Sequence, residues 1–71
     1  MQNISSLDLM VNQSLRTVAL ALIQDLEGKG KTTNDIAKFL GLSVSGYRNK
    51  VLGYRHFHSQ DVELLERMVA S

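Results

Sequence analysis

Hydrophobic residues recur at helical spacing in four segments of the chain, and short polar or glycine-containing stretches separate these segments. The first helix is expected to begin between Ser6 and Ser14, either of which can cap it, and to run to about Glu27. Gly28 and Gly30 then end it, and residues 1 to about 6 are expected to fray. Six residues form its expected buried stripe: Leu15, Val18, Ala19, Leu22, Ile23 and Leu26.

Residues 33–52, TNDIAKFLGLSVSGYRNKVL, predict two short helices joined by a tight turn. The first begins near Thr33, a capping residue, and the second is capped by Ser43 and runs to about Leu52. Phe39 is expected at the side of the first helix, packed on another helix. The expected inner faces are Ile36, Ala37 and Leu40 in the first helix and Val44, Tyr47 and Val51 in the second.

The turn between these helices is typical of a helix-turn-helix unit. Two helices that cross steeply need a small residue where they touch, and Ala37 is placed to supply it. Gly41 suits a backbone with positive φ, and Leu42 follows as an apolar plug. The second helix of such a unit is the one that enters the major groove of DNA, so the pattern points to nucleic acid as a partner.

A last helix is expected from Gln60 to about Ala70, capped by Ser59. Val62, Leu65 and Val69 mark its apolar face, which Leu64 and Met68 widen. Two interpretations of this broad face stay open. In the first, the face closes the core. In the second, Leu64 and Met68 on this face meet a second copy of the chain in a homodimer or higher homo-oligomer.

The length of 71 residues predicts a single domain, residues 1–71, with a small core. The chain has no cysteine, which excludes a disulfide framework and a thiolate metal site. It has no apolar run near the roughly 20 residues that span a bilayer, and no secretory signal is visible. The expected location is therefore the cytoplasm.

Charge is distributed unevenly although the net charge is only +1. Residues 1–28 and residues 59–71 each carry a net charge of −2. Residues 29–58 carry six basic side chains against Asp35 alone, a net charge of +5. Basic charge on and beside the predicted helix-turn-helix is typical of a phosphate-binding surface, although small domains often show uneven charge without one.

With successive residues 100° apart, Ser45, Gly46 and Asn49 are expected to face away from the core, flanked by Arg48 and Lys50. Asn pairs with adenine, Arg with guanine, and Ser with either a base or a phosphate. Ser45, Arg48 and Asn49 are therefore the expected base-reading residues, and Lys50 is expected on a phosphate. Gly46 either allows close approach to the groove or relieves crowding against the preceding helix.

Contacts to the DNA backbone are expected from residues on and around the two helices. Thr32 and Thr33 lie at a helix amino end, where free N–H groups favour a phosphate oxygen. Two roles are open for Tyr47. It is expected first as a core residue and second as a buried ring whose hydroxyl reaches outward to the DNA backbone. The full set is Lys31, Thr32, Thr33, Lys38, Ser43, Tyr47, Lys50 and Arg55.

No sequence motif supports a catalytic site or a metal site. Gly30-Lys31-Thr32 resembles the end of a phosphate-binding P-loop, but Asp25 stands where the motif needs its first glycine. His56 and His58 share one loop, where they contact phosphate or are simply solvated, and no third ligand is near. No enzyme activity, cofactor or metal is expected.

The third helix and its surroundings resemble the CII-type regulatory proteins of temperate phages. The resemblance rests on Gly41-Leu42-Ser43-Val44, on Arg48-Asn49-Lys50-Val51, and on the later Ser59-Gln60-Asp61-Val62-Glu63-Leu64-Leu65, and it covers roughly residues 32–68. It implies a small all-α fold of four to five helices like those of Cro and lambda repressor, with Arg48, Asn49 and Lys50 at recognition-helix positions. Lys50 stands where helix-turn-helix proteins usually have a core apolar residue, and Val51 follows one place later.

Two functions are weighed from the sequence. The first is a sequence-specific DNA-binding transcription regulator of phage or prophage origin, which controls the choice between lysis and lysogeny by binding operator DNA as an oligomer in a bacterial host. The alternative is a protein-interaction module on the same scaffold, such as an anti-repressor or assembly domain. The basic central segment favours the first, since an interaction module does not need it.

Overall fold

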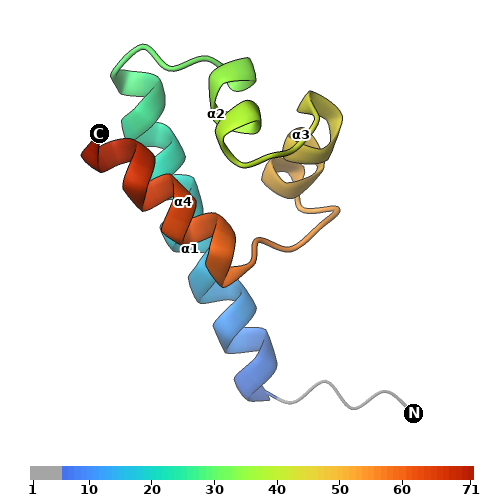
Figure 1. Ribbon diagram of the computed structural model, residues 1–71. Coiled ribbons are helices and arrows are strands. Elements are labelled where there is room, and N and C mark those ends of the chain that lie inside the picture. Colours follow the sequence, from blue (N-terminus) through green and yellow to red (C-terminus); the bar gives the residue numbers. More distant parts are fainter. Residues whose placement is uncertain (1–5) are drawn as a thin grey trace.

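Four α-helices make up the fold, as the computed structural model shows for the backbone of residues 6–71 and the side chains of residues 13–71 (Figure 1). They are α1 (Ser6–Gly28), α2 (Thr33–Phe39), α3 (Val44–Leu52) and α4 (Ser59–Ala70). The predicted all-α fold class is confirmed. The fraying expected at the start of the chain concerns residues 1–5, which lie outside the described residues, and Ser6, which is the first residue of α1.

The helices form two pairs (Figure 1). The helices α1 and α4 lie side by side and run in the same general direction, while α2 and α3 form a compact pair beside them. The α2 helix contacts both α3 and α4. Within residues 6–71, no helix has the length and apolar character needed to cross a bilayer.

The hydrophobic core lies between the two pairs of helices and draws on all four. On α1 the fully buried positions are Ala19, Ile23 and Leu26, spaced as one helical face. The inclusion of Val18 in this stripe was wrong, because its side chain is 44% exposed. The whole buried cluster consists of Ala19, Ile23, Leu26, Ile36, Ala37, Leu40, Tyr47, Phe57, Leu65 and Met68.

Phe57 is the core residue that the sequence pattern did not indicate. It lies in the segment between α3 and α4, outside any helix, yet only 2% of it is exposed. A single aromatic residue in a polar loop has no periodicity to mark it. Its burial attaches the α3–α4 connection to the core and fixes where α4 begins.

The apolar face of α4 closes the core. Leu65 and Met68 are buried, and Val62, Leu64 and Val69 are half-buried against the same cluster. The possible use of Met68 in a subunit contact is therefore wrong, since its side chain is 7% exposed and is enclosed by its own chain. Leu64 retains part of its surface. Of the remaining α4 side chains, Glu63, Glu66 and Arg67 are exposed.

Hydrogen bonds from side chains fix the start of three helices. Thr32, rather than Thr33, is the N-cap of α2, and its hydroxyl accepts a hydrogen bond from the Asp35 N–H at 3.1 Å. Asp35 in return accepts from the Thr32 N–H, which is the main reason that the pKa of this carboxyl lies below its usual value of 3.8. Ser43 caps α3 as predicted. His58, rather than Ser59, is the N-cap of α4.

The turn between α2 and α3 has the geometry expected from Gly41. Its φ of 73° lies in the left-handed region that favours glycine. The N–H groups of Gly41 and Leu42 donate to the carbonyls of Lys38 and Ala37, which closes the end of α2. Ala37 is buried and Leu42 is half-buried, so both have the packing roles that were predicted for them.

Candidate nucleic-acid interface on the third helix

One face of α3 is turned toward solvent and carries the predicted base-reading residues. Ser45, Arg48 and Leu52 are exposed, and Asn49 is half-buried. At 100° per residue these four side chains fall within about 100° of one another around the helix axis. We call Ser45, Arg48, Asn49 and Leu52 the outward face of α3.

The opposite face of α3 holds the helix against the rest of the protein. Tyr47 and Lys50 are buried, and Val44 and Val51 are half-buried. The buried side is therefore centred between Tyr47 and Lys50 rather than on Val44, Tyr47 and Val51 as predicted. The difference is a rotation of the helix that leaves the outward face in place.

Lys50 is an internal residue, and the expectation that it contacts a phosphate is wrong. Only 6% of it is exposed, and its ammonium group lies 2.6 Å from Asp61 Oδ2. The same carboxylate oxygen accepts a hydrogen bond of 2.8 Å from the His58 N–H at the start of α4. Lys50 thus lies on the buried side of α3, where Asp61 compensates its charge.

Tyr47 is likewise a core residue, so its second reading as a backbone contact is wrong. Its side chain is 3% exposed and belongs to the buried cluster. Burial, and to a smaller extent the nearby charge of Glu27, raises the pKa of the Tyr47 phenol above 10.0. The ring packs α3 against the hydrophobic core, and the phenol stays neutral at physiological pH.

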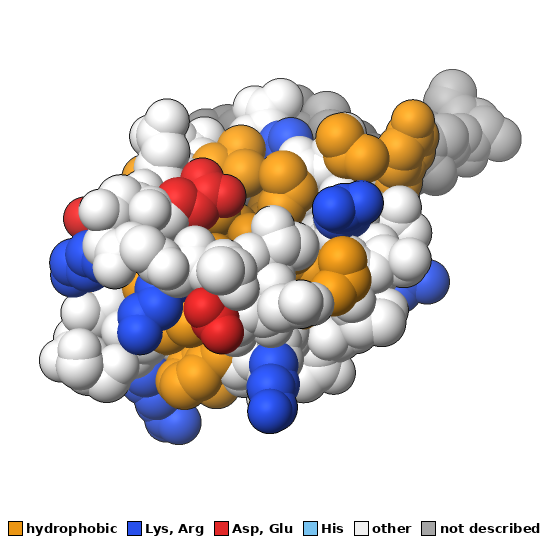
Figure 2. Space-filling model, turned by 90° about the horizontal axis from the view of Figure 1, so that it is seen from above, with side chains coloured by type: hydrophobic (Ala, Val, Ile, Leu, Met, Phe, Trp, Pro, Cys, Tyr) orange, Lys and Arg blue, Asp and Glu red, His pale blue; other side chains and the backbone are white. Residues whose placement is uncertain are grey.

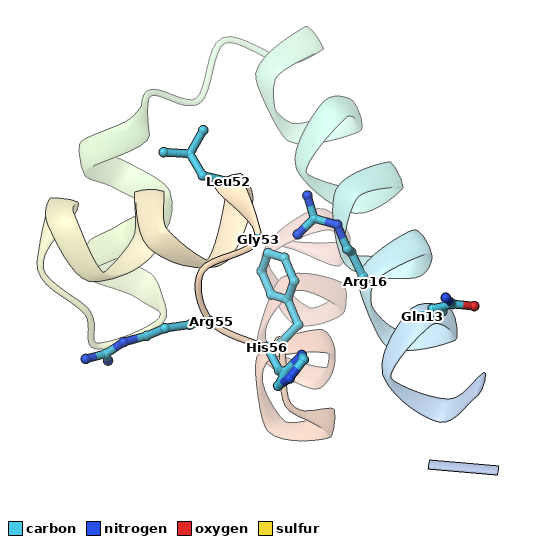
Figure 3. Close-up of a pocket in the computed structure, with 7 residues that line it drawn as sticks. Gln13, Arg16, Leu52, Gly53, Arg55 and His56 are labelled. Carbon is cyan, nitrogen blue, oxygen red and sulfur yellow. The ribbon is translucent and has the colours of Figure 1, made fainter. Parts of the chain in front are cut away.

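Arg16 joins α1 to the carboxyl end of α3, a role that no pattern in the sequence indicates. Its guanidinium donates to the carbonyl of Lys50 at 2.9 Å and to that of Val51 at 2.7 Å. These carbonyls lie in the last turn of the helix, where a cation also interacts favourably with the helix dipole. Figure 3 shows Arg16 reaching from α1 toward Gly53, at the edge of an open depression of about 420 Å³.

Replacing Arg16 with Met should destabilise the domain by roughly 1–2 kcal/mol, because two carbonyls at the end of α3 lose a charged donor. Chemical denaturation followed by circular dichroism measures the change. Arg67, an exposed arginine of α4, supplies the control, and Arg67→Met should change stability by less than about 0.5 kcal/mol. Equal effects of the two substitutions would contradict the assigned role of Arg16.

The amino end of α3 is organised by Ser43 and Gly46. The Ser43 hydroxyl is exposed and accepts a hydrogen bond of 3.0 Å from the Gly46 N–H. Gly46 is half-buried rather than outward-facing, and a Cβ atom built on it would lie 3.2 Å from the Ser43 hydroxyl. The small residue therefore relieves crowding, but against the cap of its own helix rather than against α2.

Five of the six basic residues in the central segment lie at the surface. Lys29, Lys31, Lys38, Arg48 and Arg55 are exposed. Lys50 is paired internally, and the Lys29 ammonium lies 3.4 Å from the carboxylate of Asp25. Figure 2 shows that lysine and arginine side chains on this view of the molecule are separated by uncharged and hydrophobic ones, with acidic groups among them. The exposed basic charge is smaller and more dispersed than the sequence suggested.

Polar groups at the amino end of α2 form hydrogen bonds with each other. Thr32 is exposed and Thr33 is half-buried. The hydrogen bonds between Thr32 and Asp35 use the Thr32 hydroxyl and N–H, and the Asp35 carboxylate adds negative charge where a phosphate was expected. Of the predicted contacts here, the positive charges of Lys31 and Lys38 remain the strongest.

One backbone carbonyl accepts several hydrogen bonds from the segment that follows α3. The Asn49 carbonyl accepts hydrogen bonds from the N–H groups of Gly53, Tyr54 and Arg55. Gly53 has a φ of 97°, which ends the helix in the left-handed conformation. In Figure 3 the Arg55 side chain extends away from Arg16 and α1. The tight turn thus places an exposed arginine just beyond the outward face.

Among the described residues no group of three His, Cys, Asp or Glu side chains could hold a metal ion. Comparisons of the chain with protein-family models, with curated proteins and with solved structures found no significant match.

Proposed function

We propose that this chain is a sequence-specific DNA-binding transcription regulator and that α3 is its recognition helix. The observation that carries the proposal is the outward face of α3, where Ser45, Arg48 and Asn49 stand on a short helix anchored from behind. The resemblance to CII-type regulators favours a phage or prophage protein that acts in the cytoplasm of a bacterial host.

In the proposed mechanism one set of side chains contacts phosphates and a second set contacts bases. Lys31, Lys38 and Arg55 neutralise phosphates and set the register of the protein on the duplex. Ser45, Arg48 and Asn49 then contact base edges in the major groove. A two-fold homodimer would place its recognition helices on half-sites about one helical turn, or about 34 Å, apart.

The alternative proposal is a protein-interaction module. It gains some weight because Lys50 is paired inside the fold and Asp25 lies beside Lys29 at the surface, so the exposed basic charge is lower than the sequence implied. Phe39 and Tyr54 are also large exposed side chains, with Tyr54 79% exposed. We favour DNA because neither feature explains the three polar side chains on the outward face of α3.

Selection of bound duplexes from a random pool tests the two proposals. We expect enrichment of one sequence, and a gel-shift affinity for it that falls steeply between about 50 and 200 mM salt. An interaction module would enrich no sequence. Binding of all duplexes with equal affinity would contradict recognition by α3, since phosphate contacts alone carry no sequence information.

Lys38→Ala should weaken binding to the selected and to random duplexes by the same factor. It should also reduce the slope of log affinity against log salt by about 1, as expected when one phosphate contact is lost. Gel shifts over a salt series measure both quantities. Arg67→Ala removes an equal charge from α4 and should leave the slope unchanged. If the wild type, Lys38→Ala and Arg67→Ala all have the same slope, Lys38 does not contact a phosphate.

A further inference from the structure

We propose that Leu52 is a fourth base-reading residue and that it recognises the 5-methyl group of a thymine. The inference rests on the proposed function, because it extends the recognition surface of α3 by one helical turn. It assigns Leu52 a specific chemistry within the outward face, namely apolar contact with a base edge.

The position of Leu52 along α3 supports this role. Ser45, Arg48, Asn49 and Leu52 stand at positions i, i+3, i+4 and i+7 of one helix. Recognition helices that lie along the major groove can use side chains with this spacing to contact bases. From Ser45 to Leu52 the helix rises about 10.5 Å, which is comparable with the groove width of about 12 Å. One helix can therefore present all four side chains to one stretch of duplex.

The exposure of Leu52 sets it apart from the other leucines. It is 67% exposed, whereas every other leucine among residues 13–71 is buried or half-buried. Figure 3 shows its side chain directed away from Arg16 and α1. An exposed leucine alone is ordinary. Its alignment with Ser45 and Arg48 is what points to a partner on that face.

The chemistry of the groove identifies the occupant. The edges of base pairs in the major groove offer hydrogen-bond donors and acceptors and one distinctive apolar group, the thymine methyl. Leucine has no polar side-chain atom, so it can gain only from contact with that methyl. Arg48 and Asn49 would fix the register by hydrogen bonds, and Leu52 would discriminate thymine from cytosine one turn further along.

Replacing single thymines with deoxyuridine in the selected duplex tests the proposal, because deoxyuridine lacks only the methyl group. At one thymine in each half-site, we expect the wild-type affinity to fall about fourfold. Leu52→Ala should bind the thymine and deoxyuridine duplexes equally. Val18→Ala, which truncates an exposed apolar side chain of α1, should keep the wild-type difference.

The other outcomes overturn the inference in distinguishable ways. If no thymine replacement matters, or if the effect persists in Leu52→Ala, then Leu52 does not read the methyl group, although DNA recognition by α3 stands. If the wild-type protein selects no sequence, the proposed function fails as well. If Leu52→Ala changes the oligomeric state in sedimentation without changing base discrimination, Leu52 belongs to a subunit contact instead.

Discussion

Asp61→Ala should destabilise the folded domain by about 3–5 kcal/mol, because it leaves the ammonium of Lys50 buried without its counter-charge. The same change removes the acceptor of the His58 N–H at the start of α4. Folded domains are stable by only about 5–15 kcal/mol, so a loss of this size is a large fraction of the total stability. The midpoint of urea denaturation measures the loss.

A matched set of variants separates the ion pair from other effects. Glu63→Ala removes an exposed carboxylate from the same helix and should change stability by no more than about 0.5 kcal/mol. The double variant Lys50→Met with Asp61→Asn removes both charges and keeps an acceptor for the His58 N–H. It should recover most of the stability lost in Asp61→Ala. If Asp61→Ala and Glu63→Ala behave alike, the buried pair does not stabilise the fold.

Arg48→Ala should lower the affinity for the selected duplex by roughly 5- to 150-fold, which corresponds to the loss of one two-point contact with a guanine. The affinity for random DNA should fall much less. Arg48 is exposed, so the unfolding free energy should stay within about 0.5 kcal/mol of wild type. Competition gel shifts with selected and random duplexes measure the specificity ratio.

Arg55→Ala is the control for this prediction, since Arg55 is also exposed but lies beyond the end of α3. It should weaken the selected and random duplexes by similar factors and leave the specificity ratio unchanged. If Arg48→Ala weakens binding to both kinds of duplex equally, then Arg48 contacts a phosphate and does not read a base.

Local patterns predicted most of the helices and the turn between α2 and α3. Gly41 and Ser43 act through backbone conformation and a cap within three residues, so the sequence around them contains the relevant information. Helical spacing likewise identified Ile36, Ala37 and Leu40 as buried. Ser45 was predicted to face outward and Arg48 to flank that face. Both are exposed, because periodicity sets a helix face and the rotation of α3 does not bring either side chain inward.

The errors concern contacts between residues that are distant in sequence. Lys50 looks from local sequence like a surface charge suited to a phosphate, whereas its partner is Asp61, eleven residues further on in α4. Arg16 contacts carbonyls 34 and 35 residues away, which no local pattern reveals. Met68 lies on a broad apolar arc of α4, and only the packing of α1 and α2 decides which part of such an arc is covered.

These distant contacts make α3 a better platform than its short length would suggest. Nine residues form a marginal helix in isolation. Here Lys50 ties α3 to α4 and Arg16 ties it to α1, both at its carboxyl half. The Ser43 cap fixes its amino end. A helix held at both ends presents its outward face in one orientation, which base recognition requires.

Titration of the selected duplex into isotope-labelled protein, followed by amide and side-chain NMR shifts, tests the central claim most directly. We expect the largest changes at Ser45, Arg48, Asn49 and Leu52, with smaller ones at Lys31, Lys38 and Arg55. The exposed residues of α4, such as Glu63 and Glu66, should not respond. Shifts that concentrate on α4 and spare the outward face of α3 would contradict the claim that this helix recognises DNA.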